Sequence, residues 1–391
     1  MRVAILAGLA VALAAGPAPA HDPSAWGGTF RSRDGGATWT PIDAGLFIGG
    51  AVALAIDPTN PNHILYATDT RLLRSSNGGR DWSQEPASVF LGPTMALAFD
   101  PSDKIVLAAT AAGVFRSEAG GPWKSVDLPT SALPSRAIVA GALAGRLYLT
   151  GARGLYRSDD HGQTWVRQGE PDARLTAIAV VQQPAELLVG VIEGRVFTSV
   201  DAGESWQPRN VGLPDGKIET ISVDPAAARL WAAGADRVYL SDDAAQTWRA
   251  HGQPLPQPGT RVRGVAASAD GTIIVLTTHR GVYRSTDAGG SWALMEGNLP
   301  VHLESGPLVR DPRDPGDPAT LYAGFSLTPY DEIWRRAVEG SNLLSQVDPM
   351  SLAGGAAFLI LLGVAGTYAV RRLLRSASAA AAPPTTRTPS A

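Results

Sequence analysis

The chain has 391 residues, a formal net charge of −3, 45% hydrophobic residues, 43 glycines, 30 prolines and no cysteine. The absence of cysteine excludes disulfides, thiolate catalysis and cysteine-ligated metals, and the near-neutral charge without a basic run disfavours nucleic acid as a partner. The composition agrees with an exported, turn-rich β protein.

Residues 1–20 have the form of a secretory signal peptide. Arg2 precedes an apolar run that ends at Ala15, and the small residues Ala18 and Ala20 are typical of a cleavage site. A membrane anchor is the alternative, but the apolar run is short for a span. We therefore expect cleavage after Ala20 and export of the rest of the chain.

A motif of the form Ser-x-Asp-x-Gly-x-(Thr/Ser)-Trp recurs along the chain with a period of 41 to 44 residues. Four copies are complete (32–39, 158–165, 199–206 and 285–292), and three are degenerate (75–82, 117–123 and 241–248). Seven copies at this period predict a repeat architecture. The box residues expected to be structural are Asp34, Asp160, Asp201, Asp243 and Asp287, with the closing tryptophans Trp39, Trp82, Trp123, Trp165, Trp206, Trp248 and Trp292.

We interpret the motif as a turn rather than a catalytic or metal site. Its Asp accepts backbone N–H bonds across the turn, its Gly supplies a backbone angle that other residues avoid, and its Trp begins the next strand. No histidine recurs in step with the serine, so no nucleophile and base pair follows. Calcium loops need several carboxylates where this repeat offers one. We therefore expect no catalytic residue, metal or cofactor.

The segments between the boxes predict four short strands per repeat. In the second unit these are residues 51–56, 64–68, 72–75 and a strand starting at Trp82, which is the pattern of a propeller blade; a solenoid is the alternative. Residues 28–39 supply the last two strands of a blade, and residues 306–311 and 320–325 supply the first two. We therefore expect an all-β, seven-bladed β-propeller over residues 21–336, closed by its two ends. Residues 331–336 resemble a further third strand that this scheme does not place.

The sequence after the propeller predicts a membrane anchor. Residues 337–351 form a polar linker, and residues 352–370 carry no charge over a length that matches a bilayer core. Arg371, Arg372 and Arg375 follow directly, so the positive-inside rule places the tail, residues 371–391, in the cytoplasm. We expect a single-pass membrane protein with the propeller in the periplasm or at the cell surface and a disordered tail.

Basic residues are expected to gather at one mouth of the propeller channel, opposite the boxes. Five arginines fall at nearly one phase of the repeat, before the third strands, and five more basic residues precede the first strands. The alternative is local pairing with Asp69, Glu193, Asp236, Glu219 and Glu304. The candidate partner-binding residues are Arg71, Arg153, Arg195, Arg237 and Arg280, with Arg136, Arg174, Lys217, Arg261 and Arg263.

The box residues resemble the Asp-box, or BNR repeat, of sialidases, sortilin-type receptors, some endoglucanases and the photosystem II assembly and stability factors. A single propeller with a signal peptide looks most like the photosystem II assembly factor group, which implies a non-catalytic protein-interaction role and an arginine patch. Residues 30–32 do not match the Arg-Ile-Pro motif of sialidases, and the endoglucanases use two propellers. Two functions stay open: capture of an extracytoplasmic or membrane protein through an acidic segment, and glycan binding or hydrolysis with carboxylates such as Glu219 and Glu304.

Overall fold

A computed structural model describes residues 27–339, apart from residues 44–45, 47–48, 91, 102–103, 170–173, 183–184, 225–228, 235, 301–302, 315 and 318. The predicted signal peptide, membrane span and cytoplasmic tail lie outside the described residues. No helix within the described part of the chain is both long and apolar enough to cross a bilayer.

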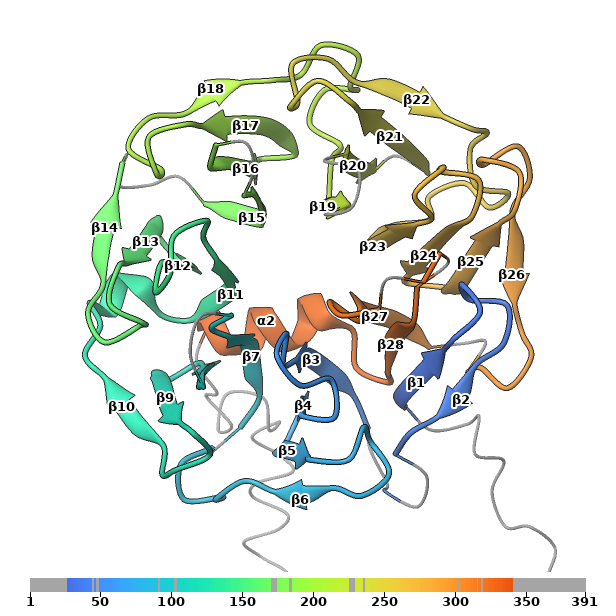
Figure 1. Ribbon diagram of the computed structural model, residues 1–391. Coiled ribbons are helices and arrows are strands. Elements are labelled where there is room, and N and C mark those ends of the chain that lie inside the picture. Colours follow the sequence, from blue (N-terminus) through green and yellow to red (C-terminus); the bar gives the residue numbers. More distant parts are fainter. Residues whose placement is uncertain are drawn as a thin grey trace, which may run out of the picture. The chain divides into compact units, whose positions relative to one another are not determined.

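The described residues form seven four-stranded antiparallel sheets arranged as a ring (Figure 1). Six blades are built from four consecutive strands each: β3–β6 (Ala51–Ile56, Ile64–Thr68, Leu72–Ser75, Ser83–Gln84), β7–β10 (Thr94–Phe99, Ile105–Thr110, Val114–Glu118, Lys124–Val126), β11–β14 (Ser135–Ala140, Leu147–Gly151, Leu155–Ser158, Val166–Gln168), β15–β18 (Leu175–Val181, Leu187–Ile192, Arg195–Ser199, Gln207–Pro208), β19–β22 (Thr220–Asp224, Arg229–Gly234, Arg237–Ser241, Arg249–His251) and β23–β26 (Val262–Ala267, Ile274–Thr278, Gly281–Ser285, Ala293–Met295).

The seventh blade combines the two ends of the described chain and closes the ring. Its strand order is β2-β1-β28-β27, with β1 (Gly28–Ser32) and β2 (Thr40–Pro41) from the beginning and β27 (Glu304–Arg310) and β28 (Leu321–Ser326) from the end. β1 pairs with β28 along its whole length, from Gly28 opposite Phe325 to Ser32 opposite Leu321. The predicted seven-bladed propeller and its mode of closure are thereby confirmed.

The core lies between neighbouring blades, because each sheet is covered on both faces. The second strands are almost fully buried, and their apolar residues meet those of the adjacent blade; one such cluster joins Tyr148 and Leu155 of one blade to Leu175, Ile178 and Leu188 of the next. Strands covered on both faces favour runs of apolar, β-branched residues over strict alternation. The short fourth strands form the rim, and β6 and β18 are exposed.

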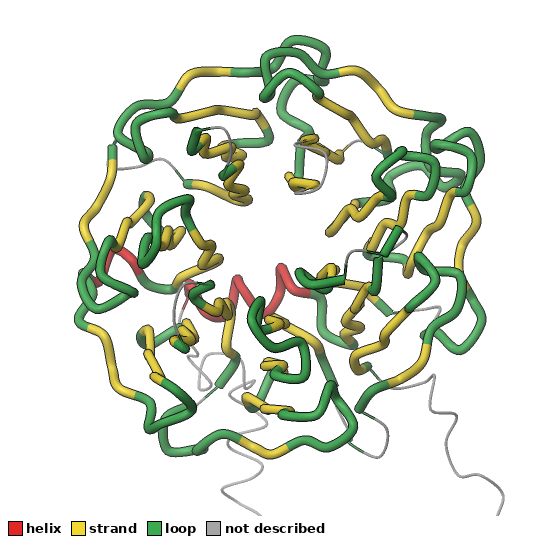
Figure 2. Tube along the Cα trace, in the orientation of Figure 1, coloured by secondary structure: helices red, strands yellow, loops and turns green. Residues whose placement is uncertain are grey.

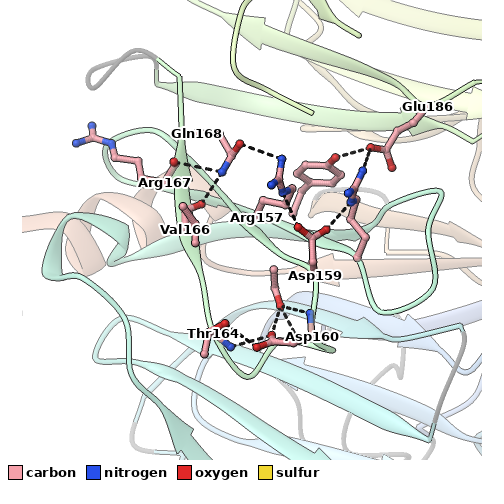
Figure 3. A network of polar contacts seen from close by, with 12 residues as sticks. Arg157, Asp159, Asp160, Thr164, Val166, Arg167, Gln168 and Glu186 are labelled. Atoms are coloured by element: carbon pink, nitrogen blue, oxygen red, sulfur yellow. Dashed lines mark hydrogen bonds and ion pairs between the residues drawn. The ribbon is translucent and has the colours of Figure 1, made fainter. Parts of the chain in front are cut away.

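The boxes form turns between third and fourth strands. In the box of β13 and β14, the Asp160 carboxylate accepts bonds from the Ser158 hydroxyl (2.7 Å), the Thr164 hydroxyl (2.6 Å) and the Thr164 N–H (2.9 Å) (Figure 3). In the equivalent turn of the next blade, hydrogen bonds from the side chain and backbone of Ser205 hold the pKa of Asp201 at about 2. These carboxylates are engaged in turn geometry, as the structural interpretation requires.

The box tryptophans are not all buried. Trp39, Trp165 and Trp248 are buried, whereas the other four are partly exposed. The indole N–H groups of Trp39 and Trp165 donate to their own boxes. Those of four others donate to the preceding blade and link blades together: Trp82 to Ile42, Trp123 to Glu85, Trp248 to Arg209 and Trp292 to Gln253.

A polar network also joins two neighbouring blades (Figure 3). Glu186, just before β16, accepts bonds from the Ala142 N–H (2.5 Å), the Tyr148 hydroxyl (2.5 Å) and Arg146 Nη1 (3.1 Å) of the preceding blade. Asp159 in turn accepts from Arg146 Nε at 2.6 Å. Glu186 thus satisfies several donors at once across the blade interface.

Residues 331–336 form a helix, and the interpretation of this segment as a strand was wrong. α2 (Tyr330–Glu339) lies over one side of the central opening of the ring (Figure 2). A short 3₁₀ turn, η2 (Thr130–Ala132), is the other helical element described. The spacing of Tyr330, Ile333 and Trp334 places the apolar residues on one helical face, and Asp331 and Glu332 in the first turn favour the helix dipole. α2 also continues beyond residue 336, the end that the sequence predicts for the propeller.

Candidate functional site

The candidate site is the mouth of the central channel, where the seven innermost strands begin. A pocket of about 630 Å³ opens there between the blades that begin with β15, β19 and β23. Beneath it, the inner strands enclose a channel space of about 440 Å³. α2 lies over the other part of the mouth, near β11, β7, β3 and β27 (Figure 1).

A β-bulge near the start of the inner strand recurs in six blades and turns one residue toward the mouth. The register slips at Val52, Met95, Arg136, Thr176 and Arg263, and across Gly306 and Pro307 in the split blade. Bulges of this kind redirect a side chain out of the alternating pattern. Together with Glu219 before β19, these residues line the channel space and form what we call the mouth ring: Val52, Met95, Arg136, Thr176, Glu219, Arg263 and Gly306.

α2 packs on the apolar side of the mouth ring. Ile333 is 5% exposed and joins Val52 and Met95 in one buried cluster, with Tyr330 and Trp334 packed beside it. The guanidinium carbon of Arg136 lies 5.0 Å from the Trp334 ring centre and 5.8 Å from that of Tyr330. These are cation–π distances, so the inner face of α2 has both apolar and aromatic contacts with the ring.

Asp331 of α2 binds the basic side of the mouth. Its Oδ2 lies 2.6 Å from Arg263 Nη2 and 2.8 Å from Arg261 Nη1, and its Oδ1 lies 3.8 Å from Arg136 Nη2. Partial burial raises the pKa of Asp331, but the hydrogen bonds and charges of Arg263 and Arg261 outweigh it and leave the pKa below its usual value. The mouth therefore holds a carboxylate in its ionised form.

Two further carboxylates lie next to Arg263. Glu304 Oε1 is 3.2 Å from Arg263 Nε and accepts the backbone N–H of Tyr330 at 3.3 Å. Burial raises the pKa of Glu219, although the positive charges of Arg263 and Arg261 oppose the shift. The two glutamates proposed as a hydrolytic pair thus share an arginine, and Glu304 also supports the start of α2.

The structure brings together only some of the ten predicted partner-binding residues. Arg136, Lys217, Arg261 and Arg263, all from the entry to first strands, line the pocket. Of the residues before third strands, Arg195 pairs with Asp215 at 3.3 Å, and Arg280 donates to Gln257 at 2.9 Å. The remaining residues are described but do not line the pocket: Arg71, Arg153, Arg174 and Arg237.

Sequence reasoning missed α2 and the mouth ring as parts of the site. Each ring residue stands near the start of a short apolar segment, such as Val52 in Ala51–Ile56 and Met95 in Thr94–Phe99. This recurring position could have been recognised in the sequence. The helix could also have been predicted, because Tyr330, Ile333 and Trp334 follow the three- and four-residue spacing of one helical face after Pro329.

The arrangement is suited to anion binding. Guanidinium groups around a half-buried carboxylate form charge-assisted bonds that are stronger than neutral ones. Among the described residues there is no group of three or more histidines or carboxylates placed to hold a metal ion. The mouth is therefore suited to the recognition of a carboxylate beside aromatic rings.

The fold and its boxes define the chain as an Asp-box β-propeller. A BNR/Asp-box repeat family matches residues 156–167. The family described as "Photosynthesis system II assembly factor YCF48" matches residues 167–299, about a third of the chain. The chain is thus similar to the photosystem II assembly factors, and the resemblance inferred from the boxes is confirmed.

Solved structures of two such proteins share the fold. "YCF48 bound to D1 peptide" and "YCF48 from Cyanidioschyzon merolae" each superpose with a TM-score of 0.54 at 15% identity, covering 72% of this chain and 93% and 97% of theirs. A curated "Xyloglucanase" from Paenibacillus sp is 24% identical over 218 residues, half of this chain. The chain spans about a fifth (20%) of that relative's length.

Proposed function

We infer that the protein is a non-catalytic interaction module whose mouth holds a carboxylate-bearing segment of another extracytoplasmic or membrane protein, as an assembly or stability factor does. One observation carries this function: Arg261 and Arg263 converge on a single carboxylate oxygen of Asp331. The similarity to assembly factors, one of which is described as bound to a D1 peptide, supports a peptide as the bound group.

The open part of the mouth gives such a segment room to bind. The pocket beside α2 is lined by Lys217, Arg261 and Arg263, while Glu219 and Asp236 contribute negative charge on the same wall. A mixed lining of this kind favours a defined register of charges over general attraction to anions, because like charges placed opposite one another are repelled.

We place this module outside the cytoplasm on a membrane anchor. Residues 1–20 and 352–370 support this arrangement by composition alone, with Arg371, Arg372 and Arg375 on the cytoplasmic side. Anchoring would confine the mouth to partners at the same membrane.

Charge reversal in the pocket tests the function. We expect Lys217→Glu combined with Arg261→Glu to lower partner capture by the detergent-solubilised full-length chain at least about tenfold, because two attractive charges become repulsive. Arg249→Glu, at an exposed position of β22, is the matched control and leaves capture unchanged. Capture is measured by affinity purification and quantitative mass spectrometry. Equal capture by the parent, the double variant and the control would show that the mouth is not the partner site. Loss of capture in Arg195→Glu combined with Arg237→Glu would show that the partner-binding surface extends outward from the pocket.

Glycan hydrolysis is the second candidate function, and Glu219 is the observation that favours it. A carboxyl group whose pKa is raised by burial is suited to act as a general acid, and the curated xyloglucanase relative points to a β-glucan substrate. Release of reducing sugar from xyloglucan by the full-length chain, lost in Glu219→Gln, would establish it. No release by the parent protein would eliminate it.

A further inference from the structure

We propose that α2 is an internal ligand that occupies the carboxylate site of the mouth and is displaced when an external acidic segment binds. This inference rests on the proposed function, because it names the regulation of the same site. It also identifies the partner's chemistry: a carboxylate with an aromatic residue next to it, as in Tyr330 and Asp331.

The contacts of α2 separate into an inner face that binds the mouth and an outer face that does not. The inner face contacts the mouth ring and Arg261 through Tyr330, Asp331, Ile333 and Trp334. On the outer face, Glu332 bonds to Arg335 at 2.8 Å and to Arg336 at 2.8 Å within the helix itself. α2 thus binds the mouth as a peptide ligand would, through one face.

The two guanidinium nitrogens that bind Asp331 Oδ2 are not free for a second carboxylate in this geometry. Arg263 Nη2 and Arg261 Nη1 both lie within hydrogen-bond distance of Asp331 Oδ2, and Arg263 Nε lies 3.2 Å from Glu304 Oε1 as an ion pair. An incoming carboxylate that uses these donors must therefore replace Asp331. Because the aromatic contacts of Arg136 belong to the same face, replacement releases the helix rather than one side chain.

The energetics of α2 permit release. A ten-residue helix on its own has only marginal stability in water. Within α2, Ile333 is the residue that is buried. Asp331 itself remains 40% exposed in the docked state. An internal ligand of this strength lowers the apparent affinity for the partner by the fraction of molecules in which the mouth is free.

The chain contains no cysteine, so one introduced thiol reports on the docking of α2. Val52→Cys places a side chain of similar size beneath Ile333, at a position only 4% exposed. Its labelling by a maleimide measures how often α2 leaves the mouth. In this background we expect Asp331→Asn to accelerate labelling about tenfold, because the charged bonds to Arg261 and Arg263 are lost. Glu332→Gln, on the outer face, is the matched control and leaves the rate within about twofold.

Peptide binding then tests whether α2 acts as a ligand of the mouth or only shields the mouth from solvent. The probe is a fluorescein-labelled peptide identical to residues 330–339, measured by anisotropy against the full-length proteins. It competes poorly with the tethered helix of the parent, and we expect about tenfold tighter binding to Asp331→Asn. The same peptide with Asn at the position of Asp331 is the control and loses this gain.

Two outcomes overturn the proposal. If Val52→Cys is labelled equally fast with Asp331 and with Asn at that position, Asp331 does not hold α2 in place. If labelling accelerates but the peptide binds both proteins equally, α2 covers the mouth without acting as its ligand. Loss of partner capture is a separate result: a mouth that binds the peptide but captures no cellular partner overturns the proposed function and leaves the internal ligand standing.

Discussion

At the residue scale, the box tryptophans differ in what their removal exposes. Trp165 is 8% exposed and belongs to the cluster with Tyr156, Leu147 and Leu149. Trp292 is partly exposed and bonds to Gln253 of the preceding blade. A buried indole leaves a cavity when removed, whereas a surface indole leaves a space that water fills.

We therefore predict that Trp165→Ala lowers the free energy of unfolding by about 3–5 kcal/mol, and that Trp292→Ala lowers it by about 1–2 kcal/mol. Urea denaturation followed by circular dichroism measures both. Equal losses in the two variants would show that the boxes act through their hydrogen bonds rather than through buried area.

Asp43 gives folding stability a dependence on pH. Its carboxylate accepts the Thr29 N–H at 2.7 Å and is 7% exposed beside the closing strand β1. Burial raises the pKa of Asp43 to about 6. The folded state therefore holds a proton that the unfolded state releases at lower pH, so this contribution is present below about pH 4 and is lost as pH rises to about 6.

We predict that Asp43→Asn removes this loss, which is at most about 3 kcal/mol, and raises stability at pH 7. Melting temperatures from pH 2 to 7 measure the effect. Asp201→Asn is a control with the opposite window, because the pKa of Asp201 is lowered to about 2; its contribution is present above about pH 4 and is lost as pH falls toward 2. A parallel pH profile for Asp43→Asn and the parent would contradict the assignment.

At the element scale, adjacent blades depend on polar links as well as on apolar clusters. Glu186 accepts three hydrogen bonds from the neighbouring blade and is 14% exposed. Replacing its charge leaves the Ala142 N–H or Arg146 with a weaker acceptor in a partly buried site. We predict that Glu186→Gln lowers the free energy of unfolding by about 1–3 kcal/mol, measured by urea denaturation. Glu204→Gln, at an exposed position of a box, is the control and should change it by less than about 0.5 kcal/mol.

The blades were predictable from the sequence because the turn residues and the apolar strand segments both indicate the same four-stranded repeat. The boxes fix each turn, and the apolar segments between them, such as Ile64–Thr68, match a strand covered on both faces. Strand order followed from closure of the ring. The bulges were not predicted, since a one-residue slip depends on what the neighbouring strand and the channel can accommodate, and not on local propensity.

The site was predicted only in its basic half. Arg261 and Arg263 were predicted from their place before a first strand, but Asp331, which they bind, lies in a segment interpreted as a strand. Residues 331–336 taken alone fit either period, and the helical spacing shows only when Tyr330 is included with Ile333 and Trp334. Arg195 and Arg280 kept the same phase as one another but pair locally outside the pocket, because third strands begin farther from the channel axis.

At the scale of the whole molecule, the sequence makes a prediction about topology. Because Arg371, Arg372 and Arg375 directly follow the proposed span, a protease added to intact spheroplasts is expected to digest the propeller and spare the tail. Immunoblots against one tag inserted after Ala20 and a second tag at the C-terminus measure this. A protected propeller with a digested tail would reverse the orientation, and full release of the propeller by a salt wash would exclude the anchor.

The pairing of β1 with β28 delays the completion of one blade during synthesis of the chain. Among the described strands β1 and β2 leave the ribosome first, yet the strand that completes their sheet is made after six other blades. At about 5–20 residues per second, the delay is on the order of 15–60 s. During that interval the inner edge of β1 has free backbone groups and can pair with any strand that passes. The first strands of the propeller to be synthesised are therefore the last to gain their stability, and it is there that a chaperone has most to protect.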